Sequence, residues 1–259
     1  MKPVPVIVLA GERPGGGLLA RHFGVAANAL VAVAGVPTIE RVVTTLRQSR
    51  MVGNGVLCGP ERSVVESSEV FRKLLATGDY RWVMPCENPA ESALSALDQL
   101  DRWPVLMTTA DHALLTPQIV ESFCTKAASS AADLVVGLAQ FDAVHAAFPE
   151  SKRTILKFAD GGRCGTNLFY LRSPAARGAL EFWKGLQSDR KQPMRMARHL
   201  GFSLMMRYVL GLLNAQQALD AIARRAGCTI GFVDVTEPQA AVDVDSVADH
   251  TLAEQLLTR

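Results

Sequence analysis

The sequence predicts an α/β fold built on a doubly wound, mostly parallel sheet. Its first half alternates strand and helix patterns, and repeated βα units form sheets of this kind. The first strand, Val4 to Ala10, is apolar on both faces, which is typical of a strand covered by helices from both sides. With 49% hydrophobic and 20% charged residues, the chain has the composition of a globular protein.

The remaining elements of the first half follow from the same two patterns. A glycine-rich loop comes after the first strand, and a helix is expected to begin after Pro37, where apolar residues recur at helical spacing. The expected strands are then 51–58, 82–84, 105–109 and 134–138, and the expected helices are 64–75, 90–100 and 117–126.

The second half of the chain changes character. Two strand patterns flank the turn-rich residues 159–162, which predicts a hairpin-like β excursion. A long helical pattern, 174–226, precedes a last strand and a C-terminal helix that begins at about Ser246. The three strands of this half are expected at 153–158, 168–171 and 229–233. We expect a single domain over residues 1–259, with 174–226 as a helical insert.

Charge and cysteine content limit the classes of function. A net charge of +2 argues against a general nucleic-acid-binding protein. The five cysteines are widely spaced and contain no CxxC pair, so we expect reduced thiols in a cytoplasmic protein. The longest apolar stretch, Leu200 to Leu213, contains Arg207 and is shorter than the roughly 20 residues that span a bilayer. No transmembrane segment is therefore expected.

The glycine-rich loop after the first strand is a candidate phosphate-binding element. Glycines at Gly11 and at 15–17 let backbone N–H groups approach an anion, and Arg13 adds a planar charged donor. The loop matches neither the Walker pattern nor GxGxxG. Taken alone, it is compatible with a phosphate site and with an ordinary surface loop.

Four short motifs in the same order give the chain a family resemblance. They are LAGxR at 9–13 with NALVAVAGVPxIxxV at 28–42, NPAxSxxxAL at 88–97, MTTADxxLLTP at 107–117 and VDVDSxxD at 242–249. Together they resemble the signatures of nucleotidyltransferases, especially the molybdenum-cofactor guanylyltransferase-like (MobA-like) group. Four weak motifs in the right order are far more specific than any one of them.

The resemblance implies roles for residues in each motif. Arg13 would bind the triphosphate, and Ser92 with the backbone around Leu9, Ala10 and Gly11 would hold the base. Position 28 corresponds to the family's signature lysine, but Asn28 stands there and carries no charge. A glycine/asparagine turn at 165–167 makes Asn167 a candidate contact to the acceptor substrate, or a simple turn residue.

Three aspartates are candidate ligands for Mg²⁺. Asp111 follows a buried strand, so it lies at the carboxyl edge of the sheet, where open α/β folds bind ligands. The alternative role for Asp111 is a charge near the N-terminus of the next helix. Asp243 and Asp245 are two apart on an extended segment and point to the same face. The family pattern favours Asp245 as the metal ligand, with Asp249 in the first turn of a helix.

The implied activity is transfer of a nucleoside monophosphate from a nucleoside triphosphate to a phosphorylated small-molecule acceptor, with release of pyrophosphate. Such chemistry needs mainly positioning and charge neutralisation. The alternative is a catalytically degenerate nucleotide-binding or regulatory protein, because the lysine is missing. A nicotinamide-dependent oxidoreductase is disfavoured, since Leu57-Cys58-Gly59 stands where an acidic ribose-binding residue is required.

The helical insert also contains a basic and methionine-rich segment. Arg190, Lys191, Arg195 and Arg198 precede the apolar residues 202–210. The pattern is compatible with a packed lid or a homodimer contact, with a cap over an anionic substrate, and with a peripheral contact to a membrane surface.

Overall fold

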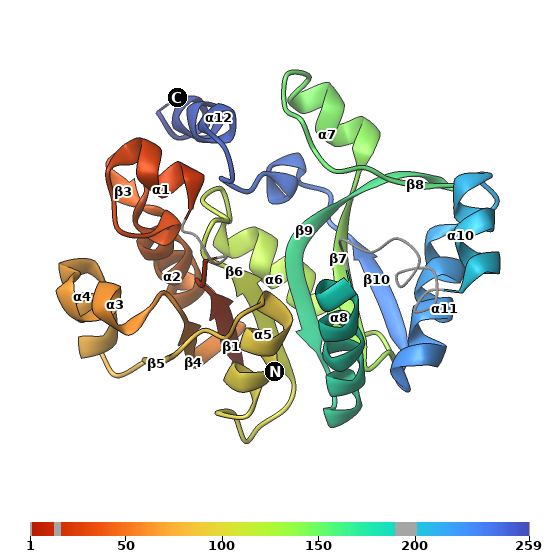
Figure 1. Ribbon diagram of the computed structural model, residues 1–259, viewed down its shortest axis with the longest axis horizontal. Helices are drawn as coiled ribbons and strands as arrows, with labels where there is room; N and C mark the ends of the chain where they lie inside the picture. Colours follow the sequence, from red (N-terminus) through yellow and green to blue (C-terminus); the bar gives the residue numbers. More distant parts are fainter. Residues whose placement is uncertain (1, 13–16, 190–200, 259) are drawn as a thin grey trace.

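The computed structural model describes residues 2–12, 17–189 and 201–258. Its main sheet is 8-stranded, with the order β10-β7-β9-β6-β1-β4-β5 and with β8 paired to β9 (Figure 1). The strands are β1 (Val4–Leu9), β4 (Val52–Cys58), β5 (Tyr80–Val83), β6 (Val105–Thr109), β7 (Leu134–Gln140), β8 (Leu156–Phe158), β9 (Gly161–Leu171) and β10 (Ile230–Asp234). The predicted α/β fold with a mostly parallel sheet is confirmed.

Helices connect most of these strands. They are α1 (Leu18–Phe23), α2 (Thr38–Gln48), α3 (Arg62–Ser67), α4 (Glu69–Ala76), α5 (Pro89–Leu97), α6 (Pro117–Ala128), α7 (Phe141–Ala147), α8 (Arg177–Asp189), α10 (Phe202–Val209), α11 (Ala215–Ala226) and α12 (Val247–Leu257). Short 3₁₀ turns lie at η1 (Asn28–Leu30), η2 (Pro174–Ala176) and η3 (Pro238–Ala241), and a small hairpin is formed by β2 (Ala32–Val33) and β3 (Val36–Pro37).

The strand order places a topological switch point beside β1. From β1 the chain moves outward through β4 to β5, all in parallel, and then returns to β6 on the other side of β1. The connections after β1 and β6 therefore diverge at the carboxyl edge of the sheet. In open α/β sheets such a divergence leaves a crevice where ligands bind.

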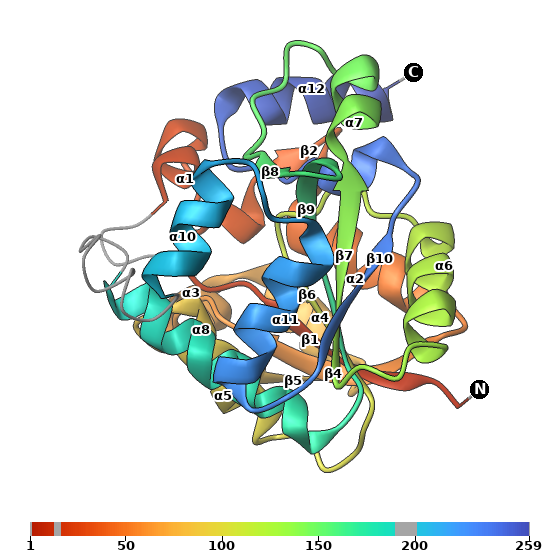
Figure 2. The same ribbon diagram turned by 90° about the vertical axis from the view of Figure 1, so that its right-hand side faces the viewer.

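Helices cover both faces of the sheet, as its apolar strands require. Alternate residues of β1 explain the two layers: Val6 and Val8 belong to a core with α2, α4 and α6, whereas Ile7 belongs to a core with α5, α8 and α11. Figure 2 shows these two helical layers on opposite sides of the strands. A strand with both faces buried has no polar alternation, which is the pattern of Val4 to Ala10.

The β excursion consists of β8 and β9, which form an antiparallel hairpin with Phe158 opposite Gly161. Its turn is therefore shorter than the 159–162 expected, and β9 is longer than 168–171. β9 is inserted antiparallel between β6 and β7. The strand expected from Arg153 begins only at Leu156, because the Arg153 side chain is drawn toward two aspartates near the C-terminus.

One expectation about the helices was wrong, and one helix was missed. The helix expected over 64–75 is broken into α3 and α4 at Ser68, whose hydroxyl accepts a hydrogen bond from the Phe71 N–H and so caps α4. Serine side chains compete in this way with a continuous helix. The sequence patterns also missed α7, a short helix directly after β7.

None of the helices among the described residues is both long and apolar enough to cross a lipid bilayer.

The close packing of β1 on β4 gives a test of the fold. A Cβ added at Gly55 would lie 2.3 Å from the Val6 carbonyl oxygen, whereas one added at Gly53 in the same strand would meet nothing closer than 3.5 Å. We expect Gly55→Ala to lower the free energy of unfolding in urea by about 2 kcal/mol, the usual cost of overpacking a sheet. Gly53→Ala is the matched control and should change it by less than about 0.5 kcal/mol. Equal effects of the two substitutions would contradict this register.

Candidate functional site

The candidate site lies at the carboxyl edge of the sheet, at the switch point between β1 and β6. Backbone hydrogen bonds hold the loops that leave three neighbouring strands side by side: Ala110 N donates to Leu9 O at 2.9 Å, and Ala10 N donates to Cys58 O at 2.8 Å. A Cβ at Gly59 would lie 2.5 Å from Gly11 N. The residues of the LAG motif, Leu9, Ala10 and Gly11, are thus fixed by backbone contacts at this edge.

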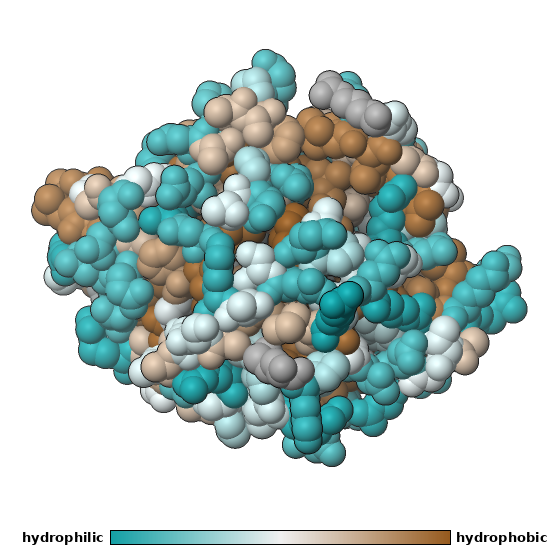
Figure 3. All heavy atoms as spheres, turned by 180° about the vertical axis from the view of Figure 1, so that it is seen from behind, coloured by the Kyte–Doolittle hydropathy of each residue, from teal (hydrophilic) through white to brown (hydrophobic). Residues whose placement is uncertain are grey.

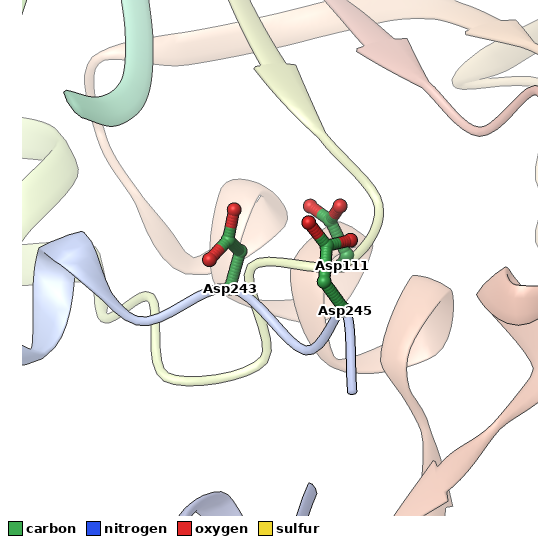
Figure 4. Close-up of side chains that lie close together, drawn as sticks. All are labelled: Asp111, Asp243 and Asp245. Carbon is green, nitrogen blue, oxygen red and sulfur yellow. The ribbon is translucent and has the colours of Figure 1, made fainter. Parts of the chain in front are cut away.

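Three carboxylates meet above this edge. One oxygen each of Asp111, Asp243 and Asp245 lies within 4.8 Å of the others, and Figure 4 shows the side chains grouped together. Asp111 comes from the loop after β6, and the other two come from the extended segment between η3 and α12. The three candidate metal ligands named from the sequence thus lie together, and their binding of a metal stays a prediction.

The segment that carries Asp243 and Asp245 is held by the residue between them. Val244 is buried in a small cluster with Leu114 and with Ala253 of α12, and its N–H donates to Asp111 O at 3.0 Å. Side chains alternate along an extended chain, so burial of Val244 turns both neighbouring carboxylates to the opposite side. This explains why the VDVDS pattern presents two acids to one point.

Asp111 is the most perturbed of the three acids. It keeps partial exposure toward the cluster, although protein atoms surround most of it. Burial first, and then the charges of Asp243 and Asp245, raise the pKa of its carboxyl to about 7. The Thr109 hydroxyl donates to Asp111 Oδ1 at 2.5 Å and opposes this shift. Three carboxylates at this spacing repel one another unless a cation binds between them.

Asp243 differs from the other two acids because an arginine partners it. The Arg153 side chain is buried, forms ion pairs with Asp243 and Asp249, and donates from Nε to the Ser151 hydroxyl at 2.8 Å. Asn167 Nδ2 donates to Asp243 Oδ2 at 3.3 Å. Asp243 is thus held from two sides, by β9 and by the loop before β8.

Asp249 has the role expected of a residue in the first turn of a helix. Its N–H donates to Ser246 Oγ at 3.2 Å, and its carboxylate accepts from Ser246 N at 3.0 Å, which completes a capping box on α12. Arg153 therefore links the cap of α12 to the acidic cluster.

Asn167 faces the acidic cluster through its bond to Asp243. Its backbone is in the left-handed region, with φ of 51°, in the middle of β9. Residues other than glycine adopt this conformation at some cost, and asparagine tolerates it best. The ladder between β7 and β9 is irregular at the same point, between Val136 and Leu138. The GTN turn of the sequence is thus a local distortion that aims Asn167 at the cluster.

Glu12 accepts backbone hydrogen bonds from the end of the glycine-rich stretch and from η1. Its carboxylate accepts hydrogen bonds from Gly17 N at 3.1 Å and from Asn28 N. These are backbone donors of the kind that a phosphate would use. The sequence analysis gave Glu12 no role. The signal that could have identified it is an acidic residue inside a loop proposed to bind anions.

Asn28, at the position of the signature lysine, has a structural contact. Its Oδ1 accepts from Ala20 N at 2.8 Å. A Cβ added at Gly17 would lie 1.9 Å from the same Oδ1 atom, so the Asn28 side chain fills that space. Asn28 therefore joins η1 to the start of α1. Arg13, predicted to bind the triphosphate, lies outside the described residues.

Ser92 is buried in α5 at the other wall of the site. Its Oγ accepts from Cys86 N at 2.9 Å, and its carbonyl receives the Cys58 thiol at 3.4 Å. Ser92 thus shapes the loop after β5. Pro85 of this loop lies against Gly11, since a Cβ added at Gly11 would lie 3.0 Å from Pro85 Cβ. Its predicted contact with a nucleotide base stays a prediction.

The acidic cluster also fits a bound divalent cation. Mg²⁺ prefers a few carboxylate oxygens together with substrate phosphates and water. Asp111 and Asp245 would each offer a carboxylate oxygen to such a cation, and Asp243, which is paired with Arg153, would orient the cluster. Sequence reasoning missed Arg153, since nothing in the pattern around it distinguishes it from a surface arginine.

Replacing Asp111 tests the repulsion within the cluster. The pKa of Asp111 in the folded protein lies above the ordinary value of 3.8. Between about pH 4 and about pH 7 the unfolded chain therefore loses this proton more readily than the folded protein does. The folded state loses stability over this range and does not regain it at higher pH. We expect Asp111→Asn to raise the free energy of unfolding by about 2 kcal/mol at pH 8 without metal, and by almost nothing at pH 4.

Urea unfolding at both pH values, with chelator, measures this difference. Asp101→Asn, an exposed substitution at the other end of β6, is the control. A destabilised Asp111→Asn protein at pH 8 would contradict a repulsive cluster.

Comparisons with known proteins agree with the geometry. A hypothetical transferase from Thermus thermophilus is similar in structure, with 27% identity, 96% of this chain and 100% of that chain covered, and a TM-score of 0.78. No curated protein sequence is significantly similar to the chain.

Two more distant solved structures share the fold. One is CMP:2-keto-3-deoxy-manno-octonic acid synthetase complexed with CTP, with 13% identity, 99% and 98% coverage of the two chains, and a TM-score of 0.60. The other is 4-diphosphocytidyl-2C-methyl-D-erythritol synthase from Anaerococcus prevotii DSM 20548, with 10% identity, 100% and 97% coverage, and a TM-score of 0.62.

The family model that matches the sequence is that of the MobA-like NTP transferase domain, over residues 6–200. The match includes β1 with its glycine loop, Ser92, and β6 with Asp111, and it covers well over half of the 259 residues. This chain therefore belongs to the MobA-like NTP transferase domain family of nucleotidyltransferases.

Proposed function

We propose that this chain is a magnesium-dependent nucleotidyltransferase that transfers a nucleoside monophosphate from a nucleoside triphosphate to a phosphorylated small molecule and releases pyrophosphate. The observation that carries the proposal is the cluster of Asp111, Asp243 and Asp245 at the switch point of the sheet, where the loop of Asp111 is bonded to the end of β1. A cation site next to backbone donors is what a triphosphate requires.

In the proposed reaction, an oxygen of the acceptor's phosphate attacks the α-phosphorus of the triphosphate. The new P–O bond forms as the bond between the α-phosphorus and its bridging oxygen breaks, and pyrophosphate leaves with that electron pair. When bound, Mg²⁺ would neutralise charge on the phosphate oxygens. Asp111 and Asp245 would hold it, and Asp243 would be kept in place by Arg153 and Asn167.

The protein's other residues would bind and orient the substrates. The backbone of Leu9, Ala10 and Gly11 and the loop shaped by Ser92 would form the wall for the base, and Arg13 would bind the triphosphate. Asn167 would stand between the acceptor and Asp243. No side chain has to move a proton, because a phosphate oxygen is already ionised at neutral pH. Positioning and charge neutralisation then supply the catalysis.

A second candidate is a nucleotide-binding protein of the same family that has lost catalysis. Two contacts favour it: the Asn28 side chain accepts from Ala20 N, and the Glu12 carboxylate accepts from the backbone N–H groups of Gly17 and Asn28. A phosphoryl-transfer site without its lysine lacks one source of charge stabilisation.

Turnover distinguishes the two candidates. Thermal unfolding with CTP, GTP, ATP or UTP, each with and without Mg²⁺, identifies the triphosphate that binds. CTP is tested first because two solved neighbours are a synthetase complexed with CTP and a diphosphocytidyl synthase. Pyrophosphate release is then measured with a panel of sugar and alcohol phosphates.

We expect release with one pair of substrates and a loss of at least about 100-fold in Asp111→Ala, since one ligand of the cation is removed. Asp101→Asn should retain full activity. Binding without release across the panel would favour the non-catalytic candidate, and no binding at all would contradict both.

Glu12 provides a test of the loop itself. Its carboxylate and a triphosphate would compete for Gly17 N and Asn28 N, and like charges repel. We expect Glu12→Gln to tighten binding of inorganic pyrophosphate and of the triphosphate by about five-fold, which corresponds to about 1 kcal/mol. Calorimetric titration measures both affinities, with the exposed Glu40→Gln of α2 as the control. Weaker binding in Glu12→Gln would mean that Glu12 orders the loop for the nucleotide.

A further inference from the structure

Helix α10 carries an apolar surface that the rest of the described protein leaves uncovered. None of its residues is buried. The side chains of Phe202 and Val209 are 73% and 75% exposed, and those of Leu210 and Leu212 are each 61% exposed. We call these four residues, together with Met206, the α10 patch. Figure 1 places α10 at its right-hand side. Figure 3 shows the molecule from behind, so the same side is at its left edge, where hydrophobic residues project.

The patch is exposed because α10 is fastened through other residues. Tyr208 Oη accepts from Lys157 N at 3.1 Å, and its ring meets Phe158 edge to face at 6.1 Å between centroids. Leu213 is buried, and its carbonyl accepts from Ala159 N at 2.9 Å. These contacts bind α10 to the β8–β9 hairpin by one side and one end, which leaves the patch facing outward. A fixed helix and the turn after it, which together expose these large apolar side chains, indicate a docking surface.

Two cations lie beside the patch. Lys157 and Arg207 are exposed there, and the exposed Asp160 of the same hairpin, whose carboxylate accepts from Ala215 N at 2.9 Å, offsets part of their charge. In the sequence, residues 190–219 contain Arg190, Lys191, Arg195, Arg198 and Arg207 but no aspartate or glutamate. Residues 190–200 lie outside the described part of the chain, so only their charge enters the argument. Apolar side chains on a short helix with nearby cations are typical of a segment that lies in the interface of an anionic membrane.

A second copy of the chain fits this surface less well. A two-fold contact would place the same patch against itself. Lys157 and Arg207 of one copy would then approach the same residues of the other, with no acidic residue from 190–219 and with Asp160 of the hairpin to offset only part of the charge. Such like charges oppose association.

We propose that the α10 patch docks this protein on the surface of an anionic lipid bilayer, with the apolar side chains in the interface and the cations at the head groups. The hairpin that holds α10 continues into β9, which carries Asn167 to the acidic cluster, so docking ties the candidate site to the membrane surface. This inference goes beyond the proposed function and does not rest on it.

Co-sedimentation of the full chain with vesicles tests the docking. We expect binding to vesicles of phosphatidylcholine with about one third phosphatidylglycerol, at least ten-fold weaker binding to pure phosphatidylcholine, and a steep loss in about 0.5 M salt. Val209→Glu with Leu210→Glu should weaken binding by at least about ten-fold, since two apolar anchors are replaced by charges that the membrane repels.

Controls separate this result from a general loss of structure. Both residues are exposed, so the double variant should keep the circular dichroism and melting temperature of the parent protein. Leu257→Glu changes an apolar residue of α12 that is 37% exposed and should leave vesicle binding unchanged. Lys157→Glu keeps the patch but should weaken binding several-fold.

Three outcomes would overturn the proposal. They are no binding to anionic vesicles, equal binding to neutral and anionic vesicles, and a dimer in light scattering that the double variant converts to monomer. The last would assign the patch to a second copy of the chain. None of these measurements uses nucleotide transfer, so failure of the proposed function leaves the test intact.

Discussion

The candidate site depends on the docking of the extended segment around Val244 against the loop after β6. Val244 is buried, and its N–H donates to Asp111 O, so a residue near the C-terminus is fixed beside a residue from the middle of the chain. The same contact turns Asp243 and Asp245 toward Asp111. Burial of Val244, together with the ion pair between Arg153 and Asp243, thus opposes the mutual repulsion of the three carboxylates.

The three carboxylates are not equivalent, and the surrounding charges explain why. Arg153 and Asn167 hold Asp243, and Arg153 also reaches Asp249 in the cap of α12. Burial and the two neighbouring acids raise the pKa of Asp111. A structure of this kind stores electrostatic repulsion where a cation would relieve it, which is a common property of metal sites. The position of α12 and the geometry of the acidic cluster are therefore coupled through one arginine.

The glycine loop has a similar internal compensation. The backbone N–H groups of Gly17 and of Asn28 donate hydrogen bonds to the Glu12 carboxylate, and Asn28 Oδ1 accepts from Ala20 N. Buried or half-buried backbone donors need partners, and the chain supplies an anion of its own. The residue that replaces the signature lysine has thereby become part of the loop's framework.

The sequence by itself determined the fold class, most strands and the identity of the three clustered acids, because apolar periodicity and ordered motifs are local properties of the chain. The spacing of Asp243 and Asp245 placed them on one face, and Asp111 followed a recognisable strand. Only the tertiary structure decided the break at Ser68, the partnership of Arg153 with Asp243, the left-handed Asn167 and the closure of the loop by Glu12. These features depend on which distant side chains and backbone groups meet, and a local pattern carries no information about such contacts.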